Sequence, residues 1–243
     1  MKVLVLAAGY GTRLYSIVKD TPKALLPINN KPLLNYTIDK IKGIKDLSEI
    51  VVVTNNKFEG IFKSWAKGLN IKKQVTILND GTNTPDDRLG SIGDIKFSLD
   101  NHKIDEDLLI VGGDNLFDFD IAKYIDFAKI KQKICIGVYD IHNLEEAKLF
   151  GVVAVDSQSL VTSFEEKPDQ PKSTLIAMCF YYLPRNTLSL LPQYLRESGK
   201  ADKAGDYIKW LHKKTEVYGF EFTGKWFDIG SVESYHEAQE NFK

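Results

Sequence analysis

The chain has 243 residues and a formal net charge of −1, and 43% of its residues are hydrophobic while 27% are charged. This composition is ordinary for a globular protein, and such a balanced charge gives no general attraction to nucleic acid or to a membrane surface. No stretch approaches the ~20 apolar residues of a membrane-spanning helix, and the apolar run at the start is too short for a signal peptide. We therefore expect a cytoplasmic protein with no nucleic-acid or membrane partner.

Runs of Val, Ile and Leu recur along the chain and predict strands. They are residues 3–6, 50–54, 75–78, 108–111, 134–139, 152–155, 177–183 and 217–222. Stripes of apolar residues at i, i+3, i+4 and i+7 predict helices between several of these runs. They are residues 33–41, 58–69, 121–128 and 207–211. Alternation of helices with strands that are apolar throughout predicts an α/β fold, a Rossmann-like, mainly parallel sheet with helices on both faces.

The pattern changes after about residue 134, where strands follow one another more closely. Segments 151–155, 161–165 and 176–183 predict a small antiparallel addition to the sheet. No linker, repeat or low-complexity segment divides the chain, so we predict one domain over residues 1–243. Because ligands of such sheets bind beyond the carboxyl ends of the strands, the loops after Leu6, Leu78 and Val111 are expected to face one cleft.

The cysteines and histidines show no pattern typical of a metal site. Cys135 and Cys179 lie far apart in apolar runs, and the four histidines have no ligand spacing. Free cysteine behaves as a small hydrophobic residue. We therefore expect two buried thiols and no zinc site.

The first strand runs into a loop rich in small residues, Leu6-Ala-Ala-Gly9-Tyr-Gly11-Thr-Arg13-Leu14. Small residues let backbone N–H groups approach an anion closely, and Arg13 and Lys23 add charge that the backbone lacks. A glycine turn alone would be explained by packing, but two cations beside it point to a triphosphate. The third glycine of a dinucleotide fingerprint is replaced by Leu14, and no Walker loop is present.

Two further segments end in acidic residues that could hold a metal ion. Asp114 follows a buried strand and two glycines, and Asp228 lies between aromatic residues and Ser231. A turn or helix-capping role would explain Asp114, and Ser231 with Ser234 or Glu233 would make an acceptable helix start. Mg²⁺, however, typically takes only one or two protein carboxylates and leaves its other positions to phosphate and water.

These runs together resemble the signature of the sugar-1-phosphate nucleotidyltransferases. The segments that carry the resemblance are residues 6–14 with 22–27, Gly-Gly-Asp114-Asn115, Trp226-Phe-Asp228-Ile-Gly-Ser231, Phe150-Gly151-Val-Val and Glu166-Lys167-Pro168. The sequence departs from the family at Ser16 and Val18 in the first loop. It also departs after residue 78, where the family has a compact glycine turn and this chain has a longer polar stretch. Gly90 and Ser91, at the end of that stretch, can take the place of the glycine turn. The chain ends soon after Asp228, so we expect no carboxy-terminal β-helix domain.

The resemblance implies a role for each matching residue. It implies catalytic roles for Arg13 and Lys23, nucleotide binding by Leu6, Ala7, Ala8, Gly9, Gly11, Thr12, Asn79 and Gly90, acceptor binding by Asn115, Gly151, Glu166 and Lys167, and a Mg²⁺ site at Asp114 and Asp228. Residues 1–133 would form a nucleotide-binding half and residues 134–243 an acceptor-binding half. Glu166 would accept hydrogen bonds from sugar hydroxyls, and Gly151 would let the sugar approach the backbone.

The resemblance also implies a Mg²⁺-dependent transfer of a nucleoside monophosphate from an NTP to a phosphorylated small molecule, with release of pyrophosphate. The leading substrates are UTP or dTTP with glucose 1-phosphate. An alternative is a cytidylyltransferase acting on phosphocholine or a phosphonate. Two other classes are a glycosyltransferase, for which Asp118-Phe-Asp120 is formally a DxD motif, and a nucleotide-sugar sensor without activity. The sequence does not indicate an oligomeric state.

Overall fold

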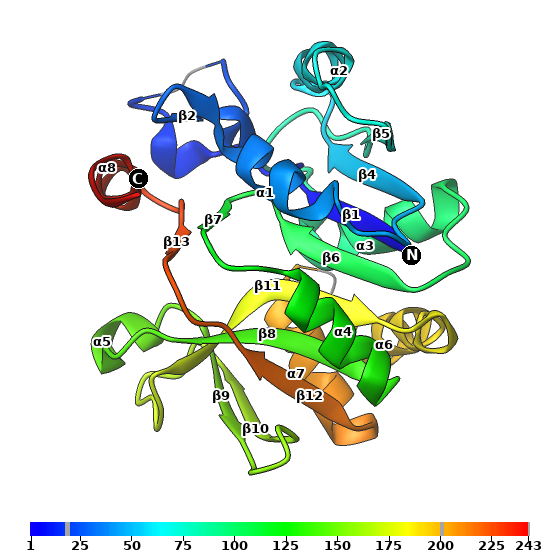
Figure 1. Ribbon diagram of the computed structural model, residues 1–243, viewed down its shortest axis with the longest axis vertical. Helices are drawn as coiled ribbons and strands as arrows, with labels where there is room; N and C mark the ends of the chain where they lie inside the picture. Colours follow the sequence, from blue (N-terminus) through cyan, green and yellow to red (C-terminus); the bar gives the residue numbers. More distant parts are fainter. Residues whose placement is uncertain (18–19, 200–201, 243) are drawn as a thin grey trace.

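The computed structural model describes residues 1–17, 20–199 and 202–242 and shows a central sheet between layers of helices (Figure 1). Val18 therefore lies outside the described residues. Four parallel strands form one half of the sheet in the order β6-β1-β4-β5. They are β1 (Lys2–Leu6), β4 (Glu49–Thr54), β5 (Gln74–Asn79) and β6 (Leu108–Gly112). The predicted strands 3–6, 50–54, 75–78 and 108–111 are thus confirmed.

The second half of the sheet is largely antiparallel. Strand β11 (Leu175–Leu183) joins β6 in antiparallel register, with Phe180 opposite Val111. Beyond β6, strand β11 also pairs with β8 (Ile134–Asp140) and β9 (Gly151–Val155). Strand β8 pairs in parallel with β12 (Val217–Glu221), and β9 forms a hairpin with β10 (Val161–Glu166). The predicted antiparallel addition is confirmed, and it includes β8.

Helices cover both faces of the sheet, as predicted. Val3 and Val5 of β1 pack in one hydrophobic cluster with Ile38 and Phe62, whereas Leu4 packs in another with Ile92. Successive side chains of a strand point to opposite faces, so both faces of β1 are buried. The helices are α1 (Leu33–Ile41), α2 (Glu59–Lys67), α3 (Gly90–Asn101), α4 (Ala122–Lys131), α5 (Leu144–Ala147), α6 (Leu190–Ser198), α7 (Ala204–Lys214) and α8 (Val232–Asn241). Within the described ranges, no helix is long and apolar enough to cross a membrane.

Short elements beside the sheet complete the fold. Two single turns, η1 (Thr12–Leu14) and η2 (Lys23–Leu25), follow β1, and a third, η3 (Arg185–Thr187), follows β11. The hairpin of β2 (Pro27–Ile28) and β3 (Lys31–Pro32) precedes α1.

A small ribbon joins distant parts of the chain near the carboxyl end of β6. Strand β7 (Asn115–Phe117) pairs antiparallel with β13 (Trp226–Asp228), and Asn115 lies opposite Asp228. Helix α8 follows directly and is held by a capping box between Ser231 and Ser234, which confirms the predicted helix start. The ribbon was not predicted, and it places Asp228 beside Asp114.

Candidate active site

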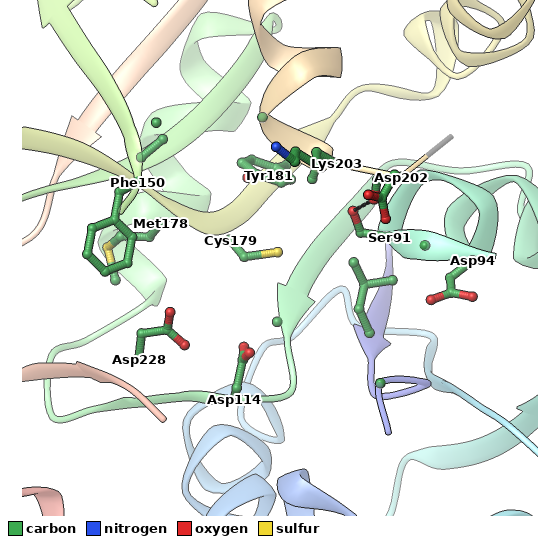
Figure 2. A pocket seen from close by; sticks show the side chains of 18 of the residues that line it. Ser91, Asp94, Asp114, Phe150, Met178, Cys179, Tyr181, Asp202, Lys203 and Asp228 are labelled. Carbon is green, nitrogen blue, oxygen red and sulfur yellow. Dashed lines mark hydrogen bonds between the residues drawn. The ribbon is translucent and has the colours of Figure 1, made fainter. Parts of the chain in front are cut away.

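A cavity of about 430 Å³ lies at the carboxyl ends of the parallel strands (Figure 2). Leu6 and Gly9 from the loop after β1, Asp80 from the loop after β5, and Asp114 from the loop after β6 all line it. The expectation that these three loops face one cleft is confirmed. Residues from β9, β10, β11 and the start of α7 form the opposite wall.

Asp114 and Asp228 point into the same part of the cavity (Figure 2). Asp114 leaves β6 after Gly113, where an added Cβ would lie 2.9 Å from the Leu6 carbonyl oxygen, so only glycine lets the β1 and β6 loops meet so closely. The Ile229 N–H donates to the Asp114 carbonyl oxygen at 3.0 Å and fixes the second carboxylate next to the first. Burial, and then the charge of Asp114, raise the pKa of Asp228 to about 6.

Three cations surround this acidic pair. The Nζ of Lys23, from η2, lies 2.6 Å from Oδ2 of Asp114. Burial alone would lower the pKa of Lys23, but the carboxylates of Asp114 and Asp228 outweigh it and raise that pKa above its ordinary value. Arg13 and Lys167 line a neighbouring cavity together with Asp228. Their positive charges lower the pKa of Asp228 and so offset part of the effect of burial. The fold therefore gathers five charged side chains at one place.

The glycine loop offers unused hydrogen-bond donors. Among the described residues, no acceptor pairs with the backbone N–H groups of residues 8–11. The Asn55 side chain donates to the Ala8 carbonyl oxygen at 2.8 Å and holds the loop from behind. Ala8 and Gly9 line the main cavity, whereas Ala7 is buried beneath it, and Gly11 (φ +62°) and Thr12 lie outside its lining. Free N–H groups in such a loop suit an anion.

The acceptor-side residues also reach the main cavity. Glu166 packs against Gly205 at the start of α7, and burial raises the pKa of its carboxyl group. Gly151 lies opposite Glu166, but an added Cβ would lie 2.5 Å from Cζ of Phe164. The glycine therefore accommodates the Phe164 ring, and the close approach of the sugar at Gly151 stays a prediction. The Asn115 side chain accepts from Trp226 Nε1 at 2.7 Å.

Like Ala7, Gly11 and Thr12, the predicted nucleotide-binding residue Asn79 does not line the main cavity. The Asn79 side chain donates to Asn56 at 2.5 Å and accepts from the Gly81 N–H at 2.9 Å. Its neighbour Asp80 lines the cavity instead, and Asp94 of α3 lies beside it. Gly90, with φ +76°, opens α3 at this wall and lies close to the backbone of Asp202.

Strand β11 contributes residues that the sequence pattern assigned to the core. Ala177, Cys179 and Tyr181 line the cavity from one side of the strand, and an irregularity in its pairing with β8 brings in Met178 as well. Cys135 is buried as expected, but Cys179 is only partly buried. Burial raises the pKa of the Cys179 thiol, so this group stays neutral in the cavity.

The donor set fits a cation that binds protein and phosphate together. Within the described ranges, no group of three or more His, Cys, Asp or Glu side chains could enclose a metal ion. Asp114 and Asp228 provide two carboxylates whose mutual repulsion a divalent cation would relieve. Mg²⁺ is typically held by one or two carboxylates plus substrate phosphates, and these two residues match that pattern.

Comparison with known proteins places the chain in a family. Residues 2–243 match the family model described as "Nucleotidyl transferase". The D-glycero-alpha-D-manno-heptose 1-phosphate guanylyltransferase of Campylobacter jejuni is 31% identical, over 97% of this chain and 97% of that protein. The bifunctional protein GlmU of Methanocaldococcus jannaschii is 29% identical over 95% of this chain, which spans about half (51%) of that relative.

Solved structures agree on the fold. UDP-glucose pyrophosphorylase complexed with UDP-glucose superposes with a TM-score of 0.81, covering 99% of this chain and 97% of that one at 22% identity. The likeness confirms the Rossmann-like α/β fold. The family match spans almost the whole chain and includes every motif on which the resemblance was based. The chain therefore belongs to the nucleotidyl transferase family, in the sugar-1-phosphate group that its motifs predict.

Proposed function

We propose that the protein transfers a nucleoside monophosphate from an NTP to a sugar 1-phosphate and releases pyrophosphate. The observation that carries this proposal is that one cavity holds a glycine loop with free N–H donors, a carboxylate pair and an acceptor wall. The loop suits the triphosphate, and Glu166 with Lys167 suits a phosphorylated sugar. Two of the proteins named above support the same reaction: one is by name a heptose 1-phosphate guanylyltransferase, and the other is a UDP-glucose pyrophosphorylase complexed with UDP-glucose.

In the proposed reaction an oxygen of the acceptor phosphate attacks the α-phosphorus of the NTP. A new P–O bond forms there, the bond from the α-phosphorus to the bridging oxygen of the β-phosphate breaks, and pyrophosphate leaves with that electron pair. The attacking phosphate is already an anion, so no general base is needed. Catalysis is then positioning and charge neutralisation, to which Lys23, Arg13 and Lys167 contribute from three sides.

We propose that Asp114 and Asp228 hold Mg²⁺ together with the substrate phosphates. When bound, the ion neutralises charge on two anions that would otherwise repel each other. Lys23, whose Nζ lies 2.6 Å from Oδ2 of Asp114, adds a positive charge at the same place and is positioned to contact a phosphate oxygen there.

A second acceptor class also has support from the neighbouring cavity. Three aromatic side chains line it, and the ring centroid of Trp226 lies 5.5 Å from that of Tyr139 and 5.5 Å from that of Phe150. Two acidic residues, Asp140 and Glu146, line the same cavity. Aromatic rings with carboxylates suit a cationic group such as the quaternary ammonium of phosphocholine. An acceptor of this kind would use the same transfer chemistry.

The glycosyltransferase alternative finds no such support. Asp118 accepts a hydrogen bond from the Lys225 N–H at 2.8 Å, and Asp120 accepts one from the Ala122 N–H at 2.8 Å at the start of α4. Both acidic residues of the formal DxD motif therefore have structural partners. Neither is among the residues that line the main cavity.

We also propose that residues 1–243 act as one domain in the cytoplasm. The single sheet that runs from the nucleotide half through β11 to the acceptor half supports one domain. The two free cysteines suit a reducing compartment, where NTPs are made.

The test is a pyrophosphate-release screen of GTP, ATP, CTP, UTP and dTTP against glucose 1-phosphate, mannose 1-phosphate and phosphocholine, with and without Mg²⁺. The proposal expects release only when NTP, a sugar 1-phosphate and Mg²⁺ are all present. Preferential turnover of phosphocholine would show that the acceptor is not a sugar 1-phosphate. If no pair of NTP and acceptor releases pyrophosphate, the transfer reaction is refuted.

A further inference from the structure

Two buried carboxyl groups line the main cavity away from the metal-binding pair. Asp80 follows β5 and is 9% exposed, and Asp94 lies on α3 and is 7% exposed. In Figure 2, Asp94 and Ser91 lie on the side of the cavity away from Asp228, with Asp114 between them. Nothing in the proposed transfer of the nucleotidyl group uses this second acidic pair.

Each of the two carboxyl groups has one buried oxygen without a hydrogen-bond partner among the described residues. Asp80 Oδ1 accepts from the N–H and the hydroxyl of Thr82, both at 2.8 Å, and so forms the turn after β5. Asp80 Oδ2 and Asp94 Oδ1 are buried and, among the described residues, have no hydrogen-bond donor. Asp94 is the fifth residue of α3, and this position excludes a helix-capping role. In the described part of the chain, the nearby cation Arg88 is paired with Asp202, at 3.9 Å, and not with either carboxyl group. A buried polar atom without a partner is costly and usually has a ligand to explain it.

The surroundings of Asp94 disfavour a negative charge on it. Burial, then the charge of Asp80 and a hydrogen bond with it, raise the pKa of Asp94 to about 8. The neutral form of Asp94 is therefore favoured. Asp80 and Asp94 both line the cavity, so their carboxyl oxygens offer hydrogen-bond acceptors to a ligand there.

The pair lies where the proposed function places the nucleobase. Leu6, Gly9 and Gly90 line the same cavity, and Ser91 lies on the same side of it as Asp94 (Figure 2). The Asp202 carbonyl oxygen accepts from the Ser91 N–H (2.9 Å) and from its hydroxyl (2.8 Å). A triphosphate on the free N–H groups of residues 8–11 would leave its base against this wall. The inference that follows rests on the proposed function.

We infer that Asp80 and Asp94 select a nucleobase with adjacent hydrogen-bond donors, which is guanine, so that the donor substrate is GTP. Guanine presents N1–H and the 2-amino group side by side, and these match carboxyl oxygens. Adenine and cytosine offer one amino group beside an unprotonated ring nitrogen. Uracil and thymine offer one N–H between two carbonyl oxygens, which the pair repels. This replaces the expectation of UTP or dTTP.

The sharpest probe is inosine triphosphate, which is GTP without the 2-amino group. Isothermal titration of the full chain with GTP, ITP and UTP in the presence of Mg²⁺ measures base selection without any need for an acceptor. We expect GTP to bind about 10- to 100-fold more tightly than ITP, the effect of one hydrogen bond to a charged group, and at least about 100-fold more tightly than UTP.

Two isosteric variants connect this preference to the carboxyl pair. Asp94→Asn and Asp80→Asn should each lower the affinity for GTP, and the variant of the residue that binds the 2-amino group should bring the ratio of GTP affinity to ITP affinity toward one. Asp100→Asn makes the same change on the exposed side of α3 and should keep the wild-type ratio.

The results separate this inference from the proposed function. UTP binding as tightly as GTP, or an unchanged ratio of GTP affinity to ITP affinity in both variants, overturns the guanine assignment while the transfer reaction stands. Failure of every nucleotide to bind overturns both. The wild-type comparison alone decides the matter if the variants do not fold.

Discussion

Replacing Gly205 by alanine should weaken acceptor binding and leave nucleotide binding unchanged. Gly205 is the second residue of α7, and an added Cβ would overlap Oε2 of Glu166 and lie 2.5 Å from its Cδ. The overlapping atoms are the end of a flexible side chain, so the Glu166 carboxylate should move while the backbone stays. The variant therefore displaces, without removing it, the group proposed to accept hydrogen bonds from the sugar.

The magnitude follows from the bond that is lost. A hydrogen bond to a charged group contributes about 1.5–3 kcal/mol, so KM for the acceptor should rise about 10- to 100-fold. The free energy of unfolding should change by less than about 1 kcal/mol, because alanine favours a helix and offsets the displaced carboxylate. Steady-state pyrophosphate release, with each substrate varied in turn, and thermal unfolding measure these quantities.

A matched control is available in α2. Gly60 is likewise the second residue of its helix, and an added Cβ there meets nothing within 4 Å. Gly60→Ala should leave both KM values at the wild-type level. An acceptor KM unchanged in Gly205→Ala, or a rise confined to the NTP, would refute the placement of the acceptor at Glu166.

Three further outcomes follow from the structure. Asp228→Asn should lower kcat about 10²- to 10³-fold without lowering Tm, because burial disfavours its charge; wild-type turnover would refute the metal-site assignment. Gly90→Ala should cost roughly 2–3 kcal/mol in urea unfolding, since φ is +76° and the new Cβ would lie 2.6 Å from Cα of Asp202; a stable variant would contradict this. Burial would raise the pKa of Glu49, but hydrogen bonds led by that with His102 lower it to about 2. The ionised Glu49 carboxylate therefore stabilises the fold fully above about pH 4.5, and this contribution is lost as the pH falls to about 2. The free energy of unfolding of Glu49→Gln should be lower than that of the wild type by roughly 2–3 kcal/mol at pH 7 and about equal to it near pH 2. A constant difference across that range in urea unfolding would argue against the depressed pKa.

Local patterns were sufficient to predict the first strand, its glycine loop and the Asp114 segment. An apolar run, small residues and then charge are contiguous in the sequence, so their physical meaning does not depend on distant parts of the chain. The same holds for the capping box at Ser231, which involves residues three apart. The family resemblance extended these local patterns to a reaction class.

Contacts between distant residues could not be predicted in this way. The three-residue ribbon that places Asp228 opposite Asn115 is too short for periodicity to fix its register, and the packing of Glu166 against Gly205 depends on how α7 docks on β10. At the end of β5 a shift of one residue reverses the direction of a side chain, which explains why Asp80 lines the cavity and Asn79 does not.

The central claim is that a bond forms between the α-phosphorus of an NTP and the phosphate of a sugar. The most direct measurement is a ³¹P NMR spectrum of the protein incubated with Mg²⁺, GTP and a hexose 1-phosphate. We predict two coupled resonances of a new diphosphate diester and an equal amount of pyrophosphate, both absent when Asp114→Asn replaces the wild type. Release of inorganic phosphate without the diester, or an unchanged spectrum with every NTP, would contradict the account.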